Sequence, residues 1–507
     1  MPHCQSRIES LVQLLEPGLP FTSQEGQAFF RLPVPSSGGY LIFPVRSHAF
    51  RDWFYAAAYH HLNLTPSAYA FSLILTLLEA RASWDPDNQR LNTFRRVAFR
   101  GSALAPNQIL LDLANPEAQF VEISPTGWTV TAGANALLQS SRSTLQLPVP
   151  INSQPGTPLD GATPPSALGT LSSSLNLATA QDWLRCLTWL LAALRPTGPY
   201  PILVLRGPAA SGKSFAARVL RSLIDPASAP LSTLPHNPDH LSALARQNWV
   251  LAFDHVSQLS PQLSDAFCRL ASGAGASVRE SPSSSLPRDL LLLNLRRPMI
   301  VTVTDCWDPA PDFASRALTV TLAGLPAEKR RPESGLLATL NAAYAGILGA
   351  LCTAVSTALS RVPTIQPAAA PRYADALAWA MAAAPALGVT ESAIQDALLE
   401  TPPDPFLQAL KSLLPPAGEW TGSATDLLAS LPASPRYSDP ATLSKYLKKR
   451  TAALFDAGLS TRSFRRPGGD RIIQIRCDSW TENSPVQLSQ TPPSVPQTQA
   501  EKDLIAA

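Results

Sequence analysis

The spacing of hydrophobic residues changes several times along the chain of 507 residues and divides it into distinct parts. In residues 1–148, apolar side chains recur at helical spacing over 47–62 and 67–84. Residues 107–130 instead alternate in the way of three short strands separated by tight turns. We therefore predict an N-terminal mixed α/β domain over residues 1–148.

The next stretch, residues 149–177, is dominated by proline, serine, glycine and threonine and predicts a linker or a long surface loop. From 178 to 330, helical and strand-like segments alternate, as in a domain with a parallel sheet. Residues 331–402 are helical throughout and predict a lid over that domain.

The segment Gly335–Val362 has almost no charge and is long enough to cross a membrane. It is rich in alanine, threonine and serine and lacks an aromatic belt, so we expect a buried or interface helix and no membrane partner. The six cysteines are scattered without paired spacing, which fits a reducing cytoplasm better than a disulfide framework or a zinc site.

Residues 403–477 show three helical segments and then a strand, a Pro-Gly-Gly-Asp turn and a second strand, a pattern that predicts a winged helix. Residues 436–476 carry ten basic and three acidic side chains, whereas the whole chain has a net charge of only +3. This asymmetry favours DNA binding, although a solvated basic face or a protein-docking domain has the same composition. The predicted DNA contacts here are Lys445, Lys448, Lys449, Arg462, Arg465 and Arg466. The tail, 478–507, lacks an apolar face and is predicted to be disordered.

Residues 207–214 read GPAASGKS and match the phosphate-binding pattern G-x-x-x-x-G-K-[ST]. The match follows an apolar strand-like run and opens a helix, which is the context that this motif requires. Small residues let backbone N–H groups converge on the phosphates of ATP, while Lys213 reaches the outer phosphates. The predicted ATP-binding residues are Gly207, Pro208, Ala209, Ala210, Ser211, Gly212, Lys213 and Ser214.

A carboxylate is expected at the end of a second buried strand, and Asp254 follows the apolar run 249–253. We predict that Ser214 and Asp254 hold Mg²⁺, and that Thr302, in the strand-like run 298–305, faces the γ-phosphate. The residue after Asp254 is His255 rather than a second carboxylate. The general base therefore stays open between His255, Glu280 and a residue that the sequence does not identify.

Two further arginine-bearing segments are candidates. Arg316 precedes a predicted strand and is either an arginine finger, a nucleotide sensor or a solvated surface group. The stretch 272–289, which carries Arg279 and Arg288, is either a hairpin that grips a DNA strand or a surface loop. The predicted catalytic set is thus Lys213, Asp254, Thr302 and Arg316.

Four segments (residues 221–235, 248–280, 296–305 and 312–322) together resemble the phage- and mobile-element-associated P-loop ATPases, which are primase-linked and superfamily-3-helicase-like with an AAA+-type core. The resemblance implies ATP-driven work on DNA in replication or mobilisation of an integrated element, by a ring-shaped homo-oligomer. It also implies a replication or defence partner for the N-terminal domain. Relatives usually have asparagine where this chain has His255 and Thr302.

Three functions remain open from the sequence. The first is a DNA-dependent ATPase that acts as a helicase, translocase or loader. The second is a slow, nucleotide-gated DNA-binding switch or scaffold, which the residues at 255 and 302 favour. The third, a P-loop kinase, lacks an identifiable acceptor-binding insert.

Overall fold

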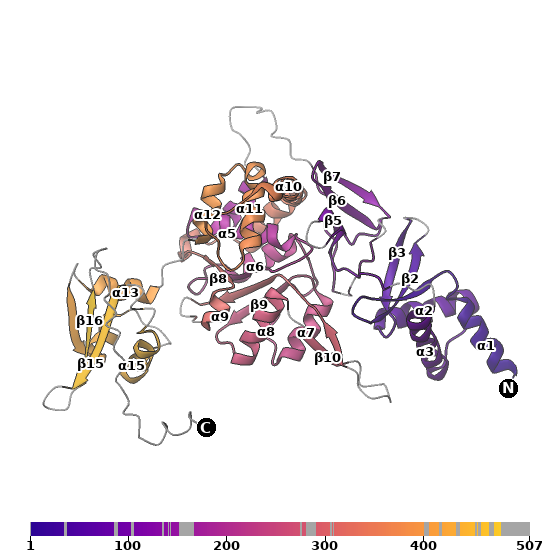
Figure 1. Cartoon of the computed structure of the whole chain (residues 1–507), viewed down its shortest axis with the longest axis horizontal. Coiled ribbons are helices and arrows are strands. Elements are labelled where there is room, and N and C mark those ends of the chain that lie inside the picture. The colour runs from indigo at the N-terminus through magenta and orange to yellow at the C-terminus, as the bar shows by residue number, and fades with distance from the viewer. Residues whose placement is uncertain are drawn as a thin grey trace, which may run out of the picture. The chain divides into compact units, whose positions relative to one another are not determined.

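The computed structural model divides into two compact units, residues 1–402 and 403–507 (Figure 1). The residues that it describes are 2–34, 38–85, 90–102, 106–133, 136–139, 141, 143–151, 167–273, 276–279, 290–304, 307, 309–399, 405–414, 418–431, 437–451, 454, 458–465 and 471–477.

The first unit begins with a three-stranded antiparallel sheet and three helices around an aromatic core. Phe30, Phe50 and Phe54 are fully buried in this core. Ser47 and Ser67 cap the two predicted helices by accepting hydrogen bonds from backbone N–H groups. The bounds are α1 Pro2–Gln13, β1 Leu19–Thr22, β2 Ala28–Val34, β3 Gly39–Pro44, α2 His48–Leu62 and α3 Ala68–Trp84.

A second antiparallel sheet follows in the order β4-β5-β6-β7, and it contains the three strands expected from the alternating pattern. This sheet packs on the later helices, because Ser356 Oγ donates to Ser124 O at 2.6 Å and Trp128 Nε1 donates to Thr353 Oγ1 at 3.0 Å. The predicted N-terminal domain is therefore not one body: its second half shares the core of the rest of the unit. The strands are β4 Val97–Gly101, β5 Pro106–Asp112, β6 Gln119–Ser124 and β7 Gly127–Ala132.

A buried ion pair joins this sheet to the central part of the unit. Arg96 Nε lies 3.0 Å from Asp225 Oδ1, and both side chains are almost fully buried. The other carboxylate oxygen of Asp225 accepts from the backbone N–H groups of Trp249 and Val250 at 2.8 and 3.0 Å. Both charges are thus satisfied by hydrogen bonds, as a buried pair requires.

The central sheet is parallel, as predicted, with the order β13-β8-β12-β9. Alternate residues along β8 enter two different hydrophobic clusters, one with Leu203 and Leu205, the other with Ile202 and Val204. The sheet is therefore buried on both faces, by α5 and α6 on one side and α7 and α8 on the other (Figure 1). The bounds are α5 Ala180–Ala193, β8 Ile202–Arg206, α6 Lys213–Ser222, α7 Pro238–Gln247, β9 Leu251–Val256, α8 Pro261–Ser272, β10 Ala276–Arg279, β11 Leu290–Leu293, β12 Met299–Val303, α9 Pro311–Ala314 and β13 Ala317–Thr321.

The prediction of a linker over 149–177 is wrong for its last part, where α4 (Ala167–Ser174) forms. Leu171 is fully buried and Leu175 nearly so, in the core that α4 shares with α10. Leucines four residues apart supply an apolar stripe, which the many serines and threonines around them concealed.

The helices after the parallel sheet are α10 (Glu333–Arg361), α11 (Ala374–Leu387) and α12 (Glu391–Leu399). Among the described residues, α10 is the one helix of a length and composition that would span a membrane. Its residues Ile347, Leu348, Leu351 and Val355 are fully buried in the protein core, as expected for a buried helix.

The second unit contains α13 (Pro405–Leu413), α14 (Ala424–Ser430), α15 (Pro440–Lys449) and a sheet in the order β14-β16-β15. The helices α13 and α14 and the hairpin of β15 (Leu459–Arg465) and β16 (Arg471–Cys477) lie where the sequence pattern predicts them. Helix α15 begins as predicted and ends at Lys449. The strand β14 (Glu419–Ser423), which pairs with β16, was not predicted.

Candidate functional site

The loop between β8 and α6 has the backbone geometry that its composition suggests. Gly212 adopts φ +89° at the start of α6, a conformation that glycine reaches without a steric penalty. A Cβ on Gly207 would lie 2.8 Å from Leu322 O and from Ser211 Oγ, so only glycine fits there. Lys213 Nζ donates to Gly207 O at 2.8 Å and to Pro208 O at 2.5 Å, which keeps the ammonium group at the loop.

Asn176 braces this loop, and the sequence reasoning missed it. Its Nδ2 donates to Ser211 O at 3.1 Å and to Ala323 O at 2.7 Å, which ties the loop to the end of β13. The residue lies in the stretch that was interpreted as a linker, and it has no motif of its own. Only the fold identifies it.

The structure brings Ser214, Asp254 and Thr302 together at the carboxyl edge of the parallel sheet. Ser214 Oγ donates to Asp254 Oδ1 at 3.0 Å, and the Thr302 hydroxyl donates to the same oxygen. Burial of this carboxylate opposes its ionisation. The hydrogen bonds from Thr302 and Ser214 and the adjacent His255 outweigh that effect, so the pKa of Asp254 lies below its ordinary value.

Thr302 therefore contacts the carboxylate directly, although it was predicted to face a phosphate. Its strand β12 lies between β8 and β9, so its hydroxyl is placed between the loop strand and the strand of Asp254. The hydroxyl oxygen of Thr302 also accepts a hydrogen bond from the backbone N–H of His255 at 2.9 Å. Thr302 thus fixes both the side chain of Asp254 and the backbone that follows it.

A β-bulge turns Asp254 and His255 out of the regular ladder. Phe253 pairs with Val301 and Val256 pairs with Val303, so two residues of β9 oppose the single residue Thr302. His255 has φ +55°, an uncommon value for a residue with a side chain. Its ring is 86% exposed, and its Nδ1 lies 2.9 Å from Asp254 Oδ2. The ring therefore occupies the position next to the carboxylate.

The structure does not bring Arg316 to this edge. Arg316 directly precedes β13, whose first residue, Ala317, pairs with Ile202 at the start of β8. The loop follows the far end of β8, so Arg316 lies at the opposite edge of the sheet from Lys213 of its own chain. Arg316 Nε donates to Ser272 Oγ at 3.0 Å, and Nη1 lies 2.9 Å from Asp312 Oδ1.

The stretch after α8 contains a pair of antiparallel strands, β10 and β11, in which Arg279 is opposite Leu290. This arrangement is the base of the expected hairpin. Arg288 and Glu280 lie outside the described residues.

In the second unit, Lys445 and Lys448 on α15 and Arg462 and Arg465 on β15 are exposed. Lys448 and Arg462 line a hollow of about 100 Å³ between α15 and the hairpin, together with Arg471, which was not predicted. Lys449 lies in α15. Arg466 is outside the described residues.

The fold is thus that of an α/β protein whose parallel sheet gathers a lysine, a serine, a threonine and an aspartate at one edge. Residues 168–396 match the family described as actinomycete integrative conjugative element replication protein. The match covers less than half of the chain, but it includes all four of these residues.

Two apo structures of the NrS-1 C-terminal region are similar to this chain at 9% and 10% identity, with TM-scores of 0.36 and 0.37. Each match covers 92% of this chain and 98% of that one. A JCV helicase structure matches 42% of this chain and 67% of its own at 14% identity, with a TM-score of 0.23. No curated protein matches the chain.

Proposed function

We propose that this protein is an ATP-hydrolysing replication protein of a conjugative or related mobile element that works on DNA. The observation that carries the proposal is the convergence of Lys213, Ser214 and Asp254 at one edge of the parallel sheet, with Ser214 Oγ 3.0 Å from Asp254 Oδ1. The family similarity over residues 168–396 supplies the replication context.

The roles follow from the chemistry of each group. The loop amides and the N-terminus of α6 attract the phosphates of ATP, and Lys213 moves from the loop carbonyls to the outer phosphates. Asn176 keeps Ser211 in place. Asp254 stays ionised because of its lowered pKa, and Thr302 orients it.

The hydroxyl of Ser214 and the carboxylate of Asp254 fit Mg²⁺, since both are hard oxygen ligands and already lie within hydrogen-bonding distance. Mg²⁺ usually takes one or two carboxylates and completes its shell with substrate phosphates and water, which agrees with a single carboxylate here. When bound, the ion would neutralise charge on the phosphates.

The position of Arg316 favours a role in a neighbouring subunit rather than in its own. By strand register, Arg316 lies at the opposite edge of the sheet from the loop of its own chain, which argues against contact with the nucleotide bound there. In a ring, an arginine finger acts in trans. Mixing Lys213→Ala subunits with Arg316→Ala subunits tests this role. In a mixed ring, some sites combine the intact lysine of one subunit with the intact arginine of its neighbour. ATP hydrolysis should reappear at those sites.

The alternative is a slow nucleotide-gated switch, and His255 favours it. His255 Nδ1 lies 2.9 Å from Asp254 Oδ2, where a second carboxylate would have polarised the attacking water. His255→Asn separates the two functions. Faster turnover would show that the imidazole restrains hydrolysis, whereas unchanged slow turnover would favour the switch.

The second unit is proposed to be the DNA-binding winged helix. Lys448 and Arg462 face the same hollow from α15 and from the hairpin, as a helix and a wing around a phosphate backbone would. Steady-state ATP hydrolysis, with and without single-stranded and duplex DNA, tests the whole proposal when wild type is compared with Lys213→Ala.

A further inference from the structure

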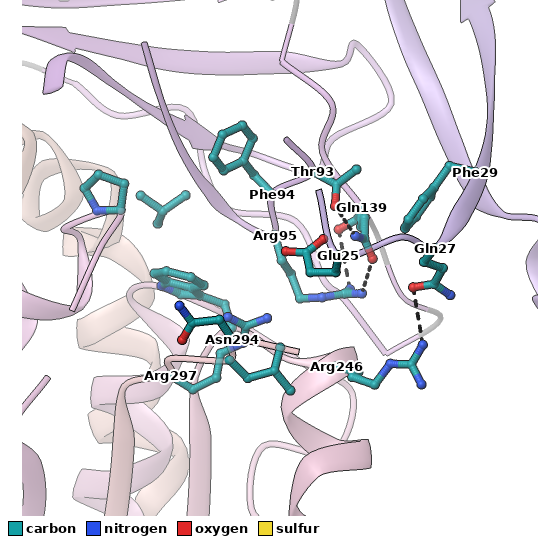
Figure 2. A pocket seen from close by; sticks show the side chains of 14 residues that line it. Glu25, Gln27, Phe29, Thr93, Phe94, Arg95, Gln139, Arg246, Asn294 and Arg297 are labelled. Carbon is teal, nitrogen blue, oxygen red and sulfur yellow. Dashed lines mark hydrogen bonds between the residues drawn. The ribbon is translucent and has the colours of Figure 1, made fainter. Parts of the chain in front are cut away.

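A polar cavity lies in the first unit, away from the loop of residues 207–214. It has a volume of about 170 Å³ and is lined by parts of residues 25–29, 93–97 and 294–297, with Arg246 and Trp249 (Figure 2). Trp249 precedes β9 and Arg297 precedes β12, so the cavity is at the amino edge of the parallel sheet. The phosphate loop is at the carboxyl edge of the same sheet.

Three arginines from three segments converge on this cavity (Figure 2). Arg95 Nη2 donates to Gln139 Oε1 at 3.0 Å, and Arg246 Nη2 donates to Gln27 Oε1 at 3.3 Å. The Gln139 amide therefore orients the Arg95 guanidinium, and the Gln27 amide contacts that of Arg246.

Backbone groups and a ring hold the third arginine. Arg297 donates to Ala245 O and Arg296 O, each at 2.8 Å, and its guanidinium lies 5.3 Å from the Trp249 ring centre. These contacts fix the direction of the side chain without neutralising its charge.

The cavity has a surplus of positive charge. Glu25 is the one carboxylate among its lining residues, and in the described part of the chain neither Arg95 nor Arg297 forms an ion pair. Burial, followed by the charge of Arg297, lowers the pKa of Arg95 to about 9. The carboxylate of Asp225 offsets part of this repulsion for both arginines, and Glu25 does so for Arg297. A further anion in the cavity would offset more of it.

The remaining lining matches a nucleotide. Phe29, Phe94 and Trp249 present aromatic surface, and Asn294 presents an amide that can pair with a base or a sugar. Guanidinium groups bind phosphate oxygens through paired N–H donors. We propose that this cavity binds a phosphate group of a nucleotide, held by Arg95, Arg246 and Arg297, at a site separate from the phosphate loop.

The size of the cavity limits the ligand. Typical small-molecule pockets measure about 300–1,000 Å³, so 170 Å³ takes one phosphate with the adjoining sugar or base rather than a dinucleotide. That phosphate belongs either to a free nucleotide or to the end of a DNA strand. The two sources share one chemistry, and the test below distinguishes them.

The experiment uses the full chain with Lys213→Ala, which removes the lysine of the phosphate loop. Isothermal titration measures the affinity for ADP and for a 5′-phosphorylated oligothymidylate, with the unphosphorylated oligonucleotide as a comparison. Arg246→Gln and Arg95→Gln are then added singly. Arg269→Gln, which removes an exposed charge on α8, is the matched control, and thermal melting checks that each variant folds.

We expect Arg246→Gln and Arg95→Gln each to weaken binding at least 10-fold, while Arg269→Gln changes it less than 2-fold. Loss confined to ADP identifies a free nucleotide, and loss confined to the phosphorylated oligonucleotide identifies a DNA end. If Arg95→Gln does not fold, Arg246→Gln alone decides. Equal affinity of Arg246→Gln and its parent, or no binding of either probe by the parent, overturns the proposal. ATP hydrolysis plays no part in this readout, so the proposed function stands or falls separately.

Discussion

Ser214 Oγ lies 3.0 Å from Asp254 Oδ1, although forty residues separate the two in the chain. The contact joins the start of α6 to the bulge in β9 across one sheet edge.

Replacing Ser214 and replacing Asp254 should affect nucleotide binding in different ways. Ser214→Ala keeps the carboxylate, so we expect about 10-fold weaker binding of Mg²⁺·ATP. Asp254→Asn should abolish turnover but retain binding of metal-free ATP, since the loop amides and Lys213 are intact. Equilibrium binding with and without Mg²⁺ distinguishes the two variants, and equal behaviour of both would contradict the assignment.

The pKa of Asp254 gives a pH prediction. Because the folded pKa is lowered, the ionised carboxylate contributes stability above its unfolded pKa, and this contribution is lost as the pH falls through the folded pKa. Thr302→Val removes a hydrogen bond to the carboxylate, so the folded pKa should rise. The acid limb of Mg²⁺·ATP binding should then move to higher pH. The control is Thr304→Val, at an exposed threonine just after β12. An unchanged limb in Thr302→Val would show that Thr302 does not set this pKa.

The backbone of His255 predicts which substitutions are tolerated. At φ +55° a β-branched residue is strained, so His255→Val should lower the free energy of unfolding by about 1–3 kcal/mol. Asparagine visits this region readily, so His255→Asn should be nearly neutral. Chemical denaturation measures both, and equal stabilities would contradict the bulge geometry.

The buried pair of Arg96 and Asp225 should be essential for the stability of the first unit. Asp225→Asn leaves a buried guanidinium without its counter-charge, which costs about 3–5 kcal/mol. The control is Asp85→Asn, at the exposed pair with Arg81, which should change stability by less than about 1 kcal/mol. Similar losses in the two variants would mean that the buried pair has no special role.

The basic hollow of the second unit predicts a specific change in salt dependence. Lys448→Gln and Arg462→Gln should each weaken DNA binding and reduce the slope of log affinity against log salt by about one. Lys411→Gln removes an exposed charge on α13 and should leave the slope unchanged. A slope that stays the same in all three variants would place the DNA contact elsewhere.

The sequence predicted those elements whose pattern lies within one short stretch of the chain. The strands of residues 107–130, the parallel sheet and the hairpin of 459–477 follow from alternation, continuous apolar runs and turn residues. Helix α4 was missed because its leucines stand among serines and threonines. The division of the N-terminal part was missed because Arg96 and Asp225 meet across 129 residues.

In the candidate site, too, some contacts between residues far apart in the chain were not predictable from local motifs. The proximity of Lys213, Ser214 and Asp254 was predictable because their segments match a phosphate-loop pattern and a carboxylate that follows a buried strand. Asn176 and the contact of Thr302 with Asp254 depend on strand order, which no local pattern encodes. The opposite-edge position of Arg316 likewise required the register of β13 with β8.

The most direct test of the account is steady-state ATP hydrolysis by the full chain, with and without single-stranded and duplex DNA, for wild type and Lys213→Ala. We predict hydrolysis that DNA stimulates several-fold and that Lys213→Ala abolishes. Tight binding of ATP and DNA by the wild type with negligible turnover would contradict the ATPase and leave the switch.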